Sequence, residues 1–212
     1  MNAMFATTAA LPTILNQPSI RIGRRRQIDD FCPDASDLDR FNRLLAKLGR
    51  RMAPLNRDQL ATAARELCDR STRGTAPPCI GLRMRRVASL SRMIADPGWH
   101  PANETIDVAG LVIDYVRGDN DLIPDRLRKV GRLDDAIVIE TAWPRLEAEV
   151  EGYLDFQRVR LLEAELRGST EFEFTRADWE QARAAEAALI THQRSVREHS
   201  YVPSAAGMFH VH

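Results

Sequence analysis

The chain has 212 residues, of which 44% are hydrophobic, and its 30 basic residues balance 30 acidic ones. This is an ordinary globular composition, with enough residues for one large core or two small ones. A net charge of zero gives no general attraction to nucleic acid or anionic membranes, which argues against both as partners. No apolar run reaches the roughly 18 residues that span a bilayer, so integral membrane insertion is not expected.

The cysteines indicate a reducing compartment. Cys32, Cys68 and Cys79 are odd in number and widely spaced, without a Cys-x-x-Cys pair. This pattern argues against a disulfide framework or a zinc site. The N-terminus also lacks the charged-then-apolar pattern of a signal peptide. Nearly all basic residues are Arg, which a GC-rich bacterial genome explains, and the sequence therefore predicts a bacterial, cytoplasmic protein.

The first part of the chain is expected to be a flexible arm. Residues 1–34 mix Thr, Ala, Pro and Asn without a sustained period and contain the basic cluster Arg24-Arg25-Arg26. At the other end, residues 201–212 are predicted to form a loose tail.

Apolar residues at helical spacing predict four helices before residue 118. The first, over 37–52, begins at a possible capping box of Ser36 and Asp39. The second begins near residue 57, with Asn56 as N-cap and Gln59 at the third helical position. The third and fourth cover 79–95 and 103–117, and the third carries a basic outer surface.

Three more helices are predicted after residue 132. The fifth begins near Leu133, and Pro144 is expected to end or kink it because proline lacks a donor and clashes with the preceding turn. The sixth covers 145–167, and the seventh follows a capping box of Thr175 and Asp178. The fold class is therefore all-α with about seven helices. We expect a helical domain over 35–143 and a C-terminal helical hairpin over 144–200.

Residues 118–135 are the most distinctive stretch of the chain. They contain five acidic residues, which are Asp119, Asp121, Asp125, Asp134 and Asp135. The segment Asp121-Leu122-Ile123-Pro124-Asp125, followed by Gly131 and then Leu133-Asp134-Asp135, resembles the core motif of the YkvA-like bacterial family. The resemblance covers about residues 79–143. It implies a helical hairpin with an acidic turn and supplies no catalytic residues, because the family has no established activity.

Three interpretations of the acidic residues are open, and one of them is an acidic surface that binds a partner. Hard cations such as Mg or Ca bind carboxylate oxygens, so Asp119, Asp121, Asp125, Asp134 and Asp135 together could form a metal site. The spacing does not fit an EF-hand, because Ile123 and Pro124 occupy positions that need a ligand and a glycine. In the structural interpretation, Asp121 locks the turn, while Asp125, Asp134 and Asp135 accept hydrogen bonds from backbone donors at helix starts.

The sequence leads to one main functional hypothesis and two alternatives. No Gly-x-Ser-x-Gly elbow, activated cysteine or glycine-rich phosphate loop is present, so no catalytic residues and no cofactor are expected. The main hypothesis is a non-enzymatic interaction or regulatory protein that binds a protein partner or itself through its C-terminal helices. The alternatives are a divalent-metal-dependent enzyme that uses the acidic residues and a nucleic-acid-binding protein that uses the clusters Arg24-Arg25-Arg26, Arg50-Arg51 and Arg83-Arg85-Arg86.

Overall fold

The computed structural model describes residues 10–18, 27–28, 31–70, 77–127, 129–168 and 173–200. Over these residues the protein is all-α, with six α-helices, one short 3-10 helix and no strand, which confirms the predicted fold class. The predicted tail, most of the predicted arm and the cluster Arg24-Arg25-Arg26 lie outside the described residues. No helix in the described ranges has the length and apolarity needed to cross a membrane.

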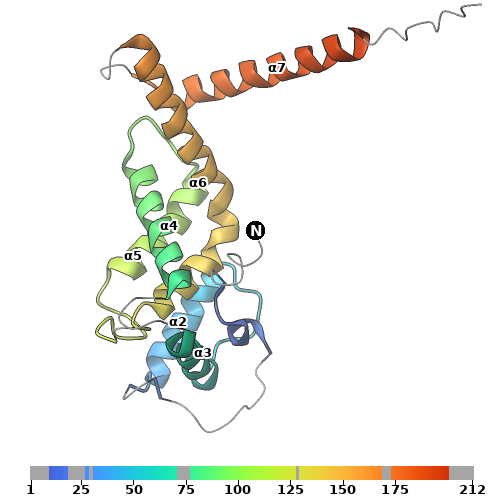
Figure 1. Ribbon diagram of the computed structural model, residues 1–212. Helices are drawn as coiled ribbons and strands as arrows, with labels where there is room; N and C mark the ends of the chain where they lie inside the picture. The colour runs from blue at the N-terminus through green and yellow to red at the C-terminus, as the bar shows by residue number, and fades with distance from the viewer. Residues whose placement is uncertain are drawn as a thin grey trace, which may run out of the picture. The chain divides into compact units, whose positions relative to one another are not determined.

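The helices follow one another in the order shown by colour in Figure 1. They are η1 (Thr13–Asn16), α2 (Ala35–Lys47), α3 (Arg57–Arg70), α4 (Pro78–Ala95), α5 (Asn103–Arg117), α6 (Leu133–Arg167) and α7 (Arg176–Ser200). The chain divides into two compact units, Met1–Leu154 and Asp155–His212. We therefore describe each unit separately.

Local side-chain contacts explain where the first helices begin. The predicted capping box of α3 is present, because Asn56 Oδ1 accepts from the Gln59 amide at 2.8 Å and Gln59 Oε1 accepts from the Asn56 amide at 3.1 Å. The cap predicted at Ser36 is wrong. Asp34 is the N-cap of α2 instead, and its carboxylate accepts from the Ser36 amide at 3.1 Å.

Pro144 does not end a helix, which corrects the prediction of separate fifth and sixth helices. It lies inside α6, which continues for 35 residues. Proline removes one backbone hydrogen bond and costs about 3 kcal/mol in a helix interior. Burial on both sides offsets this cost, because Ala142 and Leu146 flank the proline and are both fully buried.

The first half of α6 lies at the centre of the first unit. Its residues 136–139 are buried without interruption, so this segment is enclosed on every side. The connector between α4 and α5 is fixed to α6 by Trp99, whose indole donates to Glu149 at 3.1 Å and packs edge-on against Tyr153. The Tyr153 hydroxyl donates in turn to Asp96 at 3.1 Å. Together these contacts fix the end of α4 and the start of α5, the helix that leads into the acidic turn.

The apolar faces differ from the predicted ones at several positions. Met52, Ile94 and Ile106 continue the helical spacing of apolar residues in the sequence but are more than a third exposed. Arg83 was expected on the outer surface of α4 but is buried. On α5 the buried residues are Val108, Ala109 and Val112.

The second unit contains the end of α6 and the whole of α7. The Trp179 indole donates to Asp155 at 2.9 Å, and Phe156 stacks on Phe174 with ring centroids 5.5 Å apart. The predicted capping box of α7 is confirmed, because Asp178 Oδ2 accepts from the Thr175 amide at 2.8 Å. Beyond Trp179, the described side chains of α7 are exposed, except that Ala182 is partly buried.

Candidate functional site: the acidic turn

The turn between α5 and α6 is held by its own backbone. The Leu127 amide donates to the Pro124 carbonyl at 3.0 Å, and the Gly131 amide donates to the Leu127 carbonyl at 2.7 Å. Gly131 packs so tightly that a Cβ placed there would lie 2.6 Å from the carbonyl oxygen of Asp125. The close approach of these two backbone segments explains why a glycine occupies this position.

Asp134 is the residue that locks the turn. Its Oδ2 accepts from the Leu122 amide at 2.8 Å, from the Ile123 amide at 3.0 Å and from the Tyr115 hydroxyl at 2.8 Å. Asp134 is fully buried, and Leu122 and Ile123 are buried beside it. A single carboxylate oxygen at the start of α6 therefore satisfies two buried backbone donors of the turn and one side chain of α5.

Tyr115 is a member of the site that the sequence analysis did not single out. Its hydroxyl lies 3.1 Å from the Leu122 amide as well as bonding to Asp134, so it connects α5, the turn and α6. Burial, followed by the nearby charge of Asp134, raises the pKa of the Tyr115 hydroxyl far above its usual range. The hydroxyl is therefore a permanent donor to Asp134. In sequence it stands at the end of an apolar helix, and only the fold brings it to Asp134.

Within the described part of the chain, Asp135 is buried with one carboxylate oxygen unpaired. It is 3% exposed, and no hydrogen-bond partner reaches its Oδ1 among the described residues. Burial raises the pKa of Asp135 to about 8, and the charges of Asp134, Asp121 and Asp125 add to the effect. Burial also raises the pKa of Asp134 to about 6, although its hydrogen bonds oppose this. We infer that the pair holds a proton at neutral pH, mainly on Asp135.

The other three acidic residues lie toward solvent. Burial and the neighbouring Asp125 and Asp119 raise the pKa of Asp121, while Arg132 opposes this. Asp125 forms an ion pair with Arg132 at 3.5 Å, and both side chains are about half exposed. Asp119 is exposed. The structure thus separates a buried pair from three outer carboxylates.

This arrangement differs in detail from the predicted one. Asp121 was predicted to lock the turn, but the aspartate that does so is Asp134. No hydrogen bond to Asp121 occurs in the described structure. Asp134 accepts from amides that precede it in the chain, and among the described residues no helix cap by Asp125 or Asp135 is found. The sequence distance between Asp134 and its donors explains why a local capping rule missed them.

The metal hypothesis gives a clear prediction. Within the described residues, no three His, Cys, Asp or Glu side chains are arranged so that they could hold a metal ion. Asp134 Oδ2 already accepts three hydrogen bonds, and Asp125 is paired with Arg132. We expect Mg, Mn and Ca at millimolar concentrations to leave the melting temperature unchanged, with EDTA as the reference. A dose-dependent rise that Asp121→Asn removes would establish a metal site.

The arginines of α4 are used largely inside the fold. Arg83 donates to Glu140 at 2.8 and 3.0 Å and to the Cys79 carbonyl at 3.0 Å. Arg86 bonds the same carboxylate at 3.3 Å and stacks over Trp143. Two of the three arginines proposed to bind phosphate therefore fix α4 against α6, while Arg85 is exposed.

Comparisons of the chain with family models, curated proteins and solved structures found no match.

Proposed function

We propose that this protein is a non-enzymatic helical interaction protein that assembles with a second copy of itself through α7. The observation that carries the proposal is an uncovered apolar stripe on this helix. Ala182, Leu189 and Val196 are seven residues apart and therefore share one face. Leu189 is 56% exposed and Val196 is 51% exposed. A regular stripe of this kind is typical of a helix that packs against another helix.

The charges of α7 favour an antiparallel pair. Its first half carries two arginines against three acids, and the second half, from residue 188, carries two arginines against one glutamate. Two α7 helices packed in opposite directions bring the net acidic half of each against the net basic half of the other. Parallel packing would bring like halves together, which is less favourable.

The acidic turn supports a structural role for the first unit in this proposal. One carboxylate oxygen of Asp134 accepts from two backbone amides and from Tyr115. On α4 of the same unit, Arg83 and Arg86 are engaged by Glu140. The YkvA-like resemblance agrees with a hairpin scaffold of this kind. The proposal therefore assigns the first unit to stability and α7 to assembly.

The test is the mass of the full-length protein in solution, measured by light scattering over a range of concentrations. We expect the wild type to approach twice 23.9 kDa as its concentration rises. The double variant Leu189→Glu, Val196→Glu places four carboxylates in the pair interface and should remain monomeric.

The matched control is Ala184→Glu, Thr191→Glu. These two exposed positions are also seven residues apart, lie on the opposite face of α7 and add the same charge. The control should associate like the wild type. A wild type that stays monomeric at all concentrations, or a control that dissociates equally, would contradict the proposal.

A further inference from the structure

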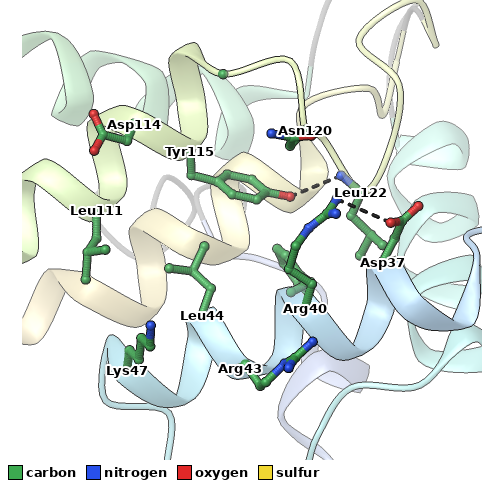
Figure 2. Close-up of a pocket in the computed structure, with 12 residues that line it drawn as sticks. Asp37, Arg40, Arg43, Leu44, Lys47, Leu111, Asp114, Tyr115, Asn120 and Leu122 are labelled. Carbon is green, nitrogen blue, oxygen red and sulfur yellow. Dashed lines mark hydrogen bonds and ion pairs between the residues drawn. The ribbon is translucent and has the colours of Figure 1, made fainter.

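A groove between α2 and α5 opens beside the acidic turn (Figure 2). Its volume is about 560 Å³, which lies within the range of about 300–1,000 Å³ found for small-molecule sites. Residues from both helices and from the turn line it, including Leu122, whose amide is bonded to Asp134. All of these residues belong to the first compact unit.

The lining combines an apolar surface with a cationic edge. Phe41, Leu44, Leu111, Leu122 and the Tyr115 ring supply the apolar contacts. Figure 2 shows the Tyr115 ring between the two helices, with Leu44 and Leu111 beside it. A ligand that fits this surface needs an extended apolar part.

Arg43 and Lys47 give the groove its charge preference. They are four residues apart on α2, so they lie on the same face of the helix, and both are exposed. Arg43 Nε donates to the Asp39 carbonyl at 3.3 Å, and neither Arg43 nor Lys47 forms an ion pair with an acid among the described residues. Arg40, in contrast, is paired with Asp37 at 3.3 Å. Asp114 lines the groove from α5 and lies at a different edge from Lys47 in Figure 2. The negative charge of Asp114 repels an anionic group, so such a group binds closer to α2 than to α5.

We propose that this groove binds an amphipathic carboxylate of the fatty-acid class. The carboxylate lies between Arg43 and Lys47, and the hydrocarbon chain lies along Leu44, Leu111 and the Tyr115 ring. Charge complementarity at one edge and apolar contact along the rest of the groove select this class over a polar anion or a neutral lipid. Because Tyr115 also donates to Asp134, an occupied groove packs against the residues that lock the turn.

Calorimetric titration of the full-length protein with decanoate, below its micelle concentration, tests the proposal. Decanoate should bind, and decanol should bind at least about tenfold more weakly, because it lacks the charge that Arg43 and Lys47 recognise. The variant Arg43→Gln, Lys47→Gln should lose at least about tenfold in decanoate affinity. Both side chains are exposed, so this variant is expected to keep its fold, which circular dichroism checks.

Two further variants make the result specific. Arg85→Gln, Arg92→Gln removes the same charge from exposed positions on α4 and should bind decanoate like the wild type. Leu44→Trp keeps both cations but fills the groove, and it should block binding.

Four binding results would each overturn the proposal, and a concentration effect is a fifth. They are equal affinity for decanol, an unchanged affinity in Arg43→Gln, Lys47→Gln, an equal loss in the α4 control, and binding only to anionic vesicles. Decanoate affinity that falls as the protein concentration rises would show that a second copy covers the groove, and would also overturn it.

Discussion

Replacing Asp134 with alanine is expected to lower the free energy of unfolding by about 3 kcal/mol, among the largest effects of any single substitution in this chain. The substitution leaves the buried Ile123 amide without its acceptor and leaves the Leu122 amide only the Tyr115 hydroxyl at 3.1 Å. Each unsatisfied buried donor costs about 1–3 kcal/mol. It also removes the partner of the Tyr115 hydroxyl. Chemical denaturation at neutral pH measures the change.

Neighbouring substitutions separate the hydrogen bonds from general effects of charge. Asp134→Asn keeps one oxygen and should cost less than alanine, and Tyr115→Phe should cost about 1 kcal/mol. The double variant should show coupling, because the two side chains share a hydrogen bond. Asp119→Ala removes an exposed acid from the same turn and should change stability by less than about 0.5 kcal/mol. Equal effects of Asp119→Ala and Asp134→Ala would refute the assignment.

The second large effect is a loss of stability as the pH rises. The pKa of Asp135 is about 8 in the folded protein, above its ordinary value of 3.8. Between these two values the folded state holds a proton that the unfolded state has released. The protonated acid therefore stabilises the fold fully below about pH 4, and this contribution is lost as the pH rises through the folded pKa. The slope is at most about 1.4 kcal/mol per pH unit for one proton.

The raised pKa of Asp134, about 6, gives an effect of the same sign over a narrower range. Because the two carboxyls lie together, removing one charge also lowers the pKa of the other. Asp135→Asn should therefore flatten the dependence of stability on pH between pH 5 and pH 8, and it should gain stability relative to the wild type as the pH rises.

Denaturation at several pH values measures the difference in unfolding free energy between the wild type and Asp135→Asn. Titrations elsewhere in the chain contribute equally to both proteins and cancel in this difference. Asp119→Asn is the control, because it removes one exposed carboxylate from the same turn. It should follow the wild-type curve. A wild-type stability that rises from pH 5 to pH 8 relative to Asp135→Asn would contradict this prediction. It would show that Asp135 is ionised in the folded protein and that its charge is stabilised there.

The sequence predicted the helices well where strong local signals are present. Residues 103–117 were predicted as a helix with the observed bounds, and the caps at Asn56 and Thr175 were predicted with their partners. These features depend on contacts within a few residues, which a pattern of apolar spacing and capping residues encodes. The helix through Pro144 was missed because its stability comes from burial on both sides of the proline.

The chemistry of the acidic turn was only partly predictable. The sequence indicated a turn held by aspartates, but it could not show which oxygen receives which donor. The partners of Asp134 lie 11, 12 and 19 residues away, and the fold alone brings them together. In the same way, Arg83 was predicted to face outward, but Glu140 lies 57 residues away and pairs with it at a buried position. Long-range pairs of this kind leave no spacing signal.

Hydrogen exchange at the Leu122 and Ile123 amides, followed by nuclear magnetic resonance, tests the central claim most directly. The claim is that the Asp134 carboxylate is a structural acceptor for these two donors. Both amides should exchange slowly in the wild type, and in Asp134→Ala they should lose more protection than the buried amides of α3. Rapid exchange of both amides in the wild type, or unchanged protection in Asp134→Ala, would contradict the account.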